Sequence, residues 1–330
     1  MYRRNLIALT ASALATSATI TGALADESDV GDAQGKLKAA LQRFMALPGT
    51  KSYVVHVGRD GSEGRIVQQP DLTMFIASGY KTFLLGQYLI DVEAERRSEE
   101  DQLAIDDTVR DFGSPVFENL VGTTTARSVM EAMMTHSDNT ATNAATLVVG
   151  APRVRQLIAQ LGLRSTRIPD SSRIFEGYVF GAPVGVDLGW PGILQFLEHA
   201  KGPFRPLLND RQTLASSAQD LVCWYELALS GKLFAKRQTV TEFKRIQAMS
   251  DQIGRATPAD TLVYAKGGEA PEVNGFSAKC FAGQMIAGRT PVTFSFILNW
   301  EGYPGRFREI ETEYFAAIKN ILQIIKKSLT

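Results

Sequence analysis

Histidine and cysteine are scarce in this chain, and the clusters from which metal sites are built are missing. The 330 residues include three histidines (His56, His136 and His199) and two cysteines (Cys223 and Cys280). None of them falls at metal-ligand spacing, and there is no His-Glu-x-x-His motif. We therefore expect no metal and no other cofactor. The two cysteines could form a disulfide or remain buried thiols, and the sequence leaves both possibilities open.

Excess charge of either sign is also missing. The chain has 35 basic and 35 acidic residues, so its formal net charge is zero at pH 7. Nucleic-acid binding needs a basic surface that neutralises phosphates, so we expect no nucleic-acid partner. Beyond the N-terminus no apolar run is long enough to cross a bilayer, so no stable membrane anchor is expected. The composition is typical of a globular protein with a sizeable core, and we expect a monomer with a small-molecule partner.

The first 25 residues have the pattern of a secretory signal peptide. Arg3 and Arg4 give a positive start, residues 6–14 are a short apolar stretch, and Ala23-Leu24-Ala25 resembles a cleavage site. An ordinary N-terminal helix is the alternative, but the apolar stretch is short and ends in the cleavage pattern. We therefore expect a secreted or periplasmic protein whose catalytic domain covers residues 26–330.

The hydrophobic pattern predicts helices and strands in a definite order. They are a helix over 35–47, hairpin strands over 52–57 and 65–67, a helical region over 78–229, strands over 261–266, 275–286 and 292–298, and a helix over 306–327. Loops rich in glycine and proline interrupt the helical region, and the longest covers residues 169–192.

This order indicates an α/β (α+β) fold. Short hairpins link the strands at both ends of the chain, which favours one antiparallel sheet flanked by the N- and C-terminal helices. Residues 26–75 and 230–330 would form the sheet lobe, and residues 76–229 would form an inserted all-helical lobe. A cleft between the lobes is where a small-molecule site is expected.

Ser78-Gly79-Tyr80-Lys81 stands where apolar residues give way to a helical run. Residues three apart share a helix face, so the Lys81 amine can lie beside the Ser78 hydroxyl. A serine becomes a nucleophile when a base takes its proton, and a lysine can serve when burial or nearby charge lowers its pKa. An ordinary helix cap has the same spacing, so the motif alone does not decide.

Ser137-Asp138-Asn139 lies between two helical runs, so we expect it in a helix–helix loop. A hydroxyl and a carboxamide there could relay a proton and hold a substrate amide. A helix N-cap formed by Ser137 or Asp138 explains the triplet equally well.

Lys266-Gly267-Gly268 ends the strand expected over 261–266. A cation at this place could bind a substrate carboxylate, and the glycines would let the substrate approach the backbone. A solvated lysine before a glycine turn is the alternative.

Taken together, the three motifs in this order resemble those of the serine β-lactamase and penicillin-binding protein superfamily, and of class A β-lactamases most closely. Residues 131–143 and 212–221 also look like segments of that family, and the resemblance covers most of the chain after residue 35. It implies a β-lactamase/transpeptidase-like fold and a serine hydrolase that forms an acyl-enzyme.

The resemblance also implies binding roles. Asn139 would bind the substrate's side-chain amide, Lys266 would hold its carboxylate, and the backbone N–H groups of Ser78 and Glu269 would form an oxyanion hole. The family usually has Thr or Ser after the lysine, where this chain has Gly267. One hydroxyl contact to the carboxylate is therefore missing.

For catalysis, the resemblance implies Ser78 as the acylated nucleophile, Lys81 as its proton acceptor and Ser137 as the donor to the leaving nitrogen. Class A enzymes activate the deacylating water with a Glu in a Glu-x-x-Leu-Asn loop, and that motif is absent here. The closest candidate is Glu176, but reaching it needs an insertion and no Asn follows. An exposed loop carboxylate is the other interpretation of Glu176, and these departures favour it.

The expected activity is hydrolysis of the β-lactam ring. Without an efficient water activator the acyl-enzyme would be long-lived, and the protein would then resemble a D,D-peptidase, an esterase or a penicillin-binding protein without turnover. The expected substrate is correspondingly a β-lactam or a peptidoglycan-like molecule.

Overall fold

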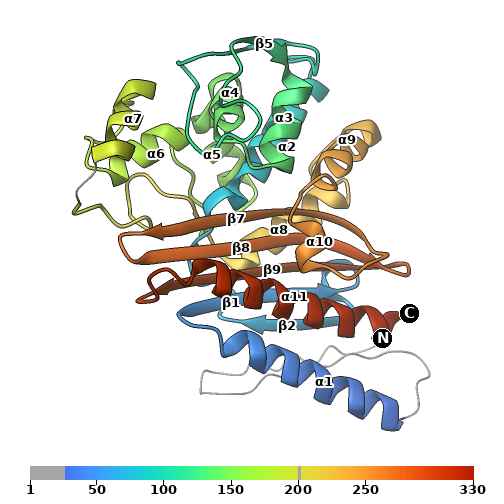
Figure 1. Cartoon of the computed structure of the whole chain (residues 1–330). Helices are drawn as coiled ribbons and strands as arrows, with labels where there is room; N and C mark the ends of the chain where they lie inside the picture. The colour runs from blue at the N-terminus through green and yellow to red at the C-terminus, as the bar shows by residue number, and fades with distance from the viewer. Residues whose placement is uncertain (1–26, 200–201) are drawn as a thin grey trace.

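The computed structural model describes residues 27–199 and 202–330, and in it one antiparallel sheet lies between two helical layers (Figure 1). The predicted signal peptide lies outside the described residues. The order of the strands in the sheet is β2-β1-β9-β8-β7. Their bounds are β1 Thr50–Val57, β2 Gly64–Gln68, β7 Leu262–Val273, β8 Phe276–Ala287 and β9 Thr290–Glu301. The N-terminal strand β1 thus pairs directly with β9 from the far end of the chain.

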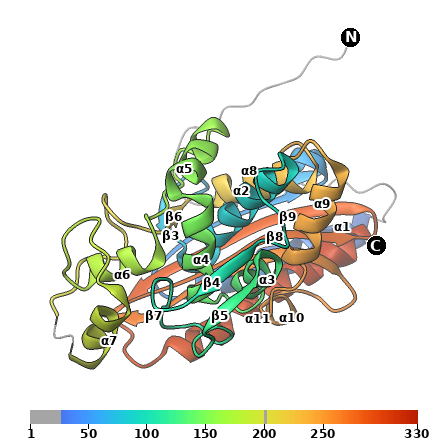
Figure 2. The same ribbon diagram turned by 90° about the horizontal axis from the view of Figure 1, so that it is seen from above.

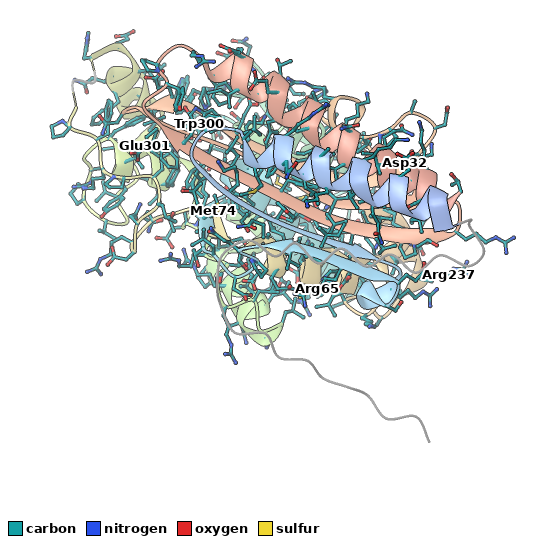
Figure 3. All side chains as sticks on the ribbon, turned by 90° about the horizontal axis from the view of Figure 1, so that it is seen from below. Asp32, Arg65, Met74, Arg237, Trp300 and Glu301 are labelled. Carbon is teal, nitrogen blue, oxygen red and sulfur yellow. The ribbon has the colours of Figure 1, made fainter. Side chains whose placement is uncertain are left out.

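Helices α1 (Glu27–Met45) and α11 (Phe307–Leu329) cover one face of the sheet side by side (Figures 1 and 3). All seven α11 residues that the helical pattern places on one face are buried: Phe307, Ile310, Tyr314, Ile318, Ile321, Leu322 and Ile325. They pack with Phe44, Tyr53 and Phe296 in one aromatic-rich core. Since each large apolar side chain stabilises the fold by roughly 1.5–3 kcal/mol when buried, this layer is a major part of the core.

The other face carries the helical region. Helix α8 (Ala218–Leu229) packs directly on β1, β8 and β9, and α2 (Lys81–Glu93) lies in the midst of the neighbouring helices (Figure 2). The remaining helices are α3 Ala126–Thr135, α4 Asn139–Val149, α5 Ala151–Gln160, α6 Ser172–Val179, α7 Gly189–His199, α9 Arg237–Gln247 and α10 Ile253–Ala256. The short turns η1 and η2 cover Arg59–Gly61 and Ala77–Tyr80. Two small sheets pair β3 (Met74–Phe75) with β6 (Ala215–Ser216) and β4 (Gln102–Ile105) with β5 (Gly122–Thr125).

The predicted fold class is therefore confirmed, and two local predictions are wrong. Residues 169–192 are not one loop, because α6 forms within them and Ser171 caps its N-terminus by accepting a hydrogen bond from the Ile174 N–H. The strand with Lys266 does not end in a glycine turn. It continues to Val273, since β8 pairs with it from Leu262 to Ala270 and, after a register shift, again at Val273.

Both cysteines are free thiols, so the disulfide alternative is not realised. Among the helices of residues 27–199 and 202–330, none combines the length and hydropathy that a membrane span requires.

Candidate active site

A cavity of about 460 Å³ opens where η2, the loop between α3 and α4, helix α6 and strand β7 meet. The predicted site residues that line it are Ser78, Lys81, Ser137, Asn139, Glu176 and Glu269. The other three, Lys266, Gly267 and Gly268, stand immediately before Glu269 in β7 and do not line the cavity. Residues of the first two motifs and Glu176 thus line one cavity, and the third motif lies next to it in β7.

The segment that presents Ser78 is held from both sides. The side chain of Asn299 accepts a hydrogen bond from the Phe75 N–H at 3.0 Å and donates one to the Phe75 carbonyl at 2.9 Å. Ala77 then takes the left-handed conformation, with φ of 46°, which is rare outside glycine and places strain next to Ser78. Ser78 follows in the 3₁₀ turn η2, at the start of α2.

Gly268 lets β7 lie against this turn. A Cβ at Gly268 would come within 2.2 Å of the Ile76 carbonyl oxygen and 2.9 Å of the Ser78 nitrogen, so no other residue fits there. The backbone of the residue after Gly268, Glu269, is thereby brought close to the backbone of Ser78. An oxyanion hole made from these two residues needs this close approach.

Lys81 is a buried amine in a nest of oxygen acceptors. Its side chain is 1% exposed and donates to the Ser137 carbonyl at 2.6 Å, the Asn139 Oδ1 at 2.8 Å and the Ser137 Oγ at 3.2 Å. Burial holds the pKa of Lys81 well below its usual range, and the charge of Lys266 lowers this pKa further. A lysine in this state can act as a proton acceptor for a neighbouring hydroxyl.

The loop between α3 and α4 contains the N-cap that the sequence offered as one interpretation, and it also brings Ser137 to Lys81. Asp138 is the N-cap of α4, since it accepts from the Ala141 N–H, and it also accepts from the N–H groups of Val116 and Phe117 at 2.9 Å each. At the same time Ser137 adopts a φ of 59° and turns toward the amine of Lys81. The cap fixes the loop, and the strained serine faces the cavity.

Glu176 is not the exposed loop carboxylate that the sequence favours. It lies on α6, is 9% exposed and lines the same cavity as Ser78 and Lys81. The helix is held in place by the Tyr80 and Ser172 hydroxyls, 3.0 Å apart, and by the stacking of Phe175 on Phe75.

Arg173 also secures α6. Its buried guanidinium forms an ion pair with Asp187 and donates to the carbonyls of Asp107, Thr108 and Arg110. These bonds join the helix to the segment before Asp111, so α6 and that segment form one wall of the cavity.

Asp111 is a second buried carboxyl group, in contact with Glu176. Burial raises the pKa of Glu176 well above its usual range, and the charge of Asp111 and a hydrogen bond to it raise this pKa further. Burial also raises the pKa of Asp111, while hydrogen bonds from Glu176 and from Asn143 oppose the rise. Two carboxyl groups this close cannot both ionise easily, so the pair holds a proton on the Glu176 side.

Sequence reasoning missed Asp111. It belongs to no motif, and nothing in the surrounding residues distinguishes it from an ordinary loop aspartate. Its position beside Glu176 follows only from the packing of α6 against the segment 107–113. The Phe112 N–H and the Asn143 side chain both donate hydrogen bonds to the Asp111 carboxylate.

Lys266 is 2% exposed, and within the described residues its amine donates only to the Gly267 carbonyl, at 2.9 Å. Burial lowers the pKa of Lys266 to about 8, against the opposing charges of Asp251 and Glu269. A buried cation with one neutral acceptor is under-satisfied, which suits a group that binds an anionic ligand.

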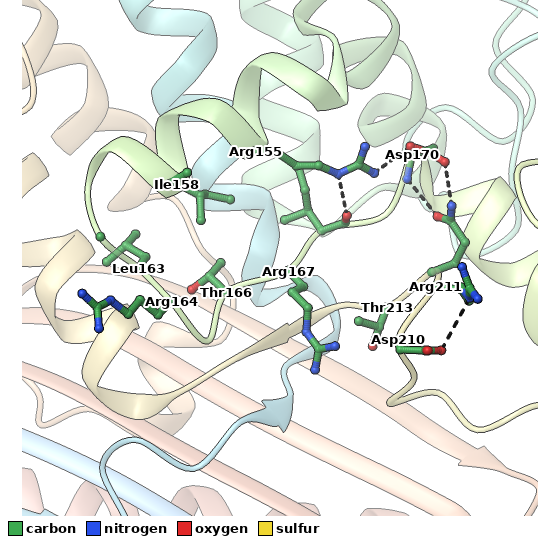
Figure 4. A pocket seen from close by; sticks show the side chains of 14 residues that line it. Arg155, Ile158, Leu163, Arg164, Thr166, Arg167, Asp170, Asp210, Arg211 and Thr213 are labelled. Atoms are coloured by element: carbon green, nitrogen blue, oxygen red, sulfur yellow. Dashed lines mark hydrogen bonds and ion pairs between the residues drawn. The ribbon is translucent and has the colours of Figure 1, made fainter.

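A second cavity, of about 720 Å³, lies between α5 and the segments around residues 167 and 211 (Figure 4). Four arginines line it, and two of them pair with carboxylates of the same wall, Arg155 with Asp170 and Arg211 with Asp210. None of the predicted site residues lines it, and it contains no serine–lysine pair. The cavity with Ser78 is therefore the candidate active site.

Comparisons with known proteins identify the family and the fold. A model of the β-lactamase enzyme family matches residues 36–278. Among curated protein sequences, none matches the chain.

Solved structures share the fold at low sequence identity. A β-lactamase from Chitinophaga pinensis is 15% identical with a TM-score of 0.70, and the alignment covers 90% of this chain and 100% of that one. A β-lactamase from Xanthomonas campestris pv. campestris is 17% identical with a TM-score of 0.68, covering 90% and 99%. A protein described as PBP-A is 15% identical with a TM-score of 0.66, covering 89% and 97%.

Proposed function

This chain belongs to the β-lactamase enzyme family, and we propose that it is a serine hydrolase that opens the β-lactam ring through an acyl-enzyme on Ser78. The observation that carries the proposal is the buried amine of Lys81, with its lowered pKa, in the same cavity as the Ser78 hydroxyl. A serine needs such a base before it can attack a carbonyl carbon.

In the acylation step, the neutral Lys81 amine takes the Ser78 proton and the serine oxygen attacks the β-lactam carbonyl. The backbone N–H groups of Ser78 and Glu269 stabilise the negative charge on the carbonyl oxygen. The ring C–N bond then breaks, and Ser137, which is hydrogen-bonded to Lys81, passes a proton to the leaving nitrogen. Asn139 and Lys266 bind the substrate's amide and carboxylate.

In the deacylation step, water attacks the ester on Ser78, and the free serine and the ring-opened acid are released. We propose Glu176 as the base that activates this water. Its burial in the wall of the cavity and its electrostatic interaction with Lys81 support this role. Glu176 can accept a proton only in its ionised form, which Asp111 disfavours.

The Asp111–Glu176 contact also favours a second candidate function. If the pair keeps its proton at neutral pH, deacylation is slow and the acyl-enzyme accumulates. The protein would then act as a D,D-peptidase-like or esterase-like acyl hydrolase, or as a penicillin-binding protein without turnover. Its natural ligand would be peptidoglycan-like.

The experiment that separates these functions uses purified protein lacking residues 1–25. Hydrolysis of a chromogenic cephalosporin is measured first, and the intact mass is then recorded after incubation with penicillin. Turnover that Ser78→Ala abolishes supports the β-lactamase, and a lasting adduct on Ser78 without turnover supports the second candidate. Neither turnover nor adduct would refute both.

The role of Glu176 is tested with Glu176→Gln, which keeps the shape of the side chain. We expect the burst of acylation to remain and steady turnover to fall by about 100-fold or more, since a general base contributes roughly 10²–10⁴. The matched control is Glu198→Gln on α7, whose side chain is 70% exposed and outside the cavity. Unchanged deacylation in Glu176→Gln would remove Glu176 from the mechanism.

We further propose that the mature protein is monomeric and works outside the cytoplasm, after removal of residues 1–25. The signal-like pattern of those residues supports export. Removing them takes away Arg3 and Arg4, which leaves 33 basic and 35 acidic residues, and this small acidic excess agrees with a small-molecule substrate.

A further inference from the structure

The space beside Gly267 is already filled by another side chain. A Cβ on Gly267 would lie 1.8 Å from Oε1 of Gln252, 2.5 Å from its Cδ and 3.1 Å from its Nε2. The carboxamide of Gln252 therefore occupies the volume that a threonine or serine side chain at position 267 would need. The carboxamide of Gln252 thus stands where the side chain of a hydroxyl residue after Lys266 would stand.

Among the described residues, the carboxamide of Gln252 has no hydrogen-bond partner. Its Oε1 is buried and accepts no hydrogen bond, and within residues 27–199 and 202–330 its Nε2 donates none. A buried polar atom that makes no hydrogen bond costs about 1–3 kcal/mol. Such a group is expected where a ligand completes its hydrogen bonding.

The residue before Gln252 is tied to the segment that lines the candidate active-site cavity. The N–H of the preceding residue, Asp251, donates to the Thr135 carbonyl at 3.2 Å, and the Asp251 carboxylate lies 3.6 Å from Nδ1 of His136. His136 lines the cavity, and so does Ser137. Residues 251–252 are thereby fixed to the loop that carries Ser137.

The amine of Lys266 can take a further acceptor, beside the charges of Asp251 and Glu269 that already act on it. The amine of Lys266 is buried and donates only to the Gly267 carbonyl within the described part of the chain. The Gln252 carboxamide covers the same Gly267 from its Cα side. A carboxylate placed at Lys266 would meet the amine on one side and an amide donor on the other.

We propose that Gln252 is a substrate-binding residue that donates a hydrogen bond to the substrate carboxylate, in place of the hydroxyl that Gly267 lacks. This inference rests on the proposed function, because it names a contact to the substrate of that same site. A half-turn of the amide exchanges its oxygen and nitrogen at no steric cost, so a donor can face the carboxylate. The residue acts on substrate binding and takes no part in proton transfer.

The test compares a chromogenic cephalosporin that has a free carboxylate with its methyl ester, in wild type and in Gln252→Ala. For the acid we expect KM to rise about 10- to 100-fold with kcat nearly unchanged, as a hydrogen bond to a charged group is lost. For the ester we expect KM to stay within about twofold. Gln252→Met, which keeps the volume of the side chain, should give the same split, and it serves if the alanine variant does not fold.

A reciprocal pair of variants sharpens the test. Gly267→Thr alone should bind the acid poorly, because its side chain collides with Gln252. Gln252→Ala combined with Gly267→Thr should recover most of the lost affinity, since the carboxamide gives way to a hydroxyl. The matched control is Gln284→Ala on β8, whose amide donates to Thr293 and does not approach Gly267.

If the Gln252 variants raised KM equally for the acid and the ester, the inference would be overturned, because Gln252 would then have a structural role. Unchanged KM for the acid in both Gln252 variants would also overturn it, even when wild type is acylated normally. If wild type is acylated by neither substrate, the proposed function itself fails and this contact fails with it.

Discussion

At Lys81 and Glu176, burial acts on charges of opposite sign with one result. It lowers the pKa of the amine and raises the pKa of the carboxyl group, so both side chains are driven toward their neutral forms. The proposed acylation of Ser78 requires a neutral amine. A neutral carboxylic acid is the wrong form for activating water, so the two half-reactions should differ in their pH dependence.

This difference gives a prediction for Asp111→Asn. The change removes a negative charge and a proton acceptor beside Glu176, so the pKa of Glu176 should fall. Because Glu176 works as a base only when ionised, the acid limb of the pH profile of kcat should move to lower pH by about one unit or more, where one unit corresponds to roughly 1.4 kcal/mol. The measurement is steady-state hydrolysis of a chromogenic cephalosporin between pH 4.5 and 9.

The control for this prediction is Asp107→Asn. Asp107 belongs to the same segment but its side chain is 71% exposed and pairs with Arg110. The Asp107→Asn variant should therefore keep the acid limb of the kcat profile at the wild-type pH. An acid limb that stays put in Asp111→Asn as well, with Glu176 still needed for turnover, would mean that the two carboxyl groups do not share a proton.

At the scale of elements, the sequence predicted those features that local residues determine. Ser78-x-x-Lys81 opens a helix and Ser137-Asp138-Asn139 joins two helices, because spacing and capping are properties of a few neighbouring residues. Glu176 was misjudged because its burial depends on α6 packing against a segment about 65 residues away. The contact between Gln252 and Gly267 could not be predicted, since it joins a helix start to a strand interior.

Strand β8 and helix α11 are tied by a buried ion pair that reaches the active site. The fully buried amine of Lys279 donates to Glu311 and to Glu269, at 2.8 Å each. Arg255 and Arg308 also bind the Glu311 carboxylate. Burial would raise the pKa of Glu311, but these hydrogen bonds and the charge of Lys279 outweigh it and hold the pKa far below its usual range.

We therefore predict that Glu311→Gln lowers the free energy of unfolding at pH 7 by about 3–5 kcal/mol, because Lys279 keeps a buried charge with only Glu269 to pair it. Urea unfolding measures the change. The depressed pKa of Glu311 stabilises the fold above the unfolded-state pKa and is lost as pH falls through the folded-state value. The gap between wild type and variant should thus narrow steadily below about pH 4.5.

Glu313→Gln is the matched control, on the same helix but exposed to solvent. Its unfolding free energy should stay within about 0.5 kcal/mol of wild type. If Glu311→Gln also lowered the free energy of unfolding by no more than about 0.5 kcal/mol, the buried Lys279 would not depend on the Glu311 carboxylate.

At the scale of the whole molecule, the candidate active site is assembled from distant parts of the chain. Ser78, the Ser137 loop and Glu176 come from the helical region. Lys266 and Glu269 come from β7 at the edge of the sheet. The fold class could be predicted because the hydrophobic pattern of the strands and of α11 is strong. The relative placement of the sheet edge and the helices follows from packing that no local pattern records.

The export of the whole chain, which residues 1–25 predict, can also be tested. In a bacterial host we expect the purified extracytoplasmic protein to begin at Asp26, since Ala23 and Ala25 provide the small residues that signal cleavage requires. Intact mass measures the start. Ala25→Leu should prevent cleavage, whereas Leu24→Phe, at the permissive middle position, should not. A mature mass that still includes residues 1–25 would contradict the prediction.

The pairing of β1 with β9 has a consequence for how the chain is made. During synthesis β1 and α1 emerge first, but β9 and α11, against which they pack, are translated last. The central part of the sheet cannot close before residues 290–301 have left the ribosome, and such long-range pairing is slow. A chain that completes its fold only after its last strand appears would stay largely unfolded during synthesis. A secretion channel that passes unfolded chains accepts this state.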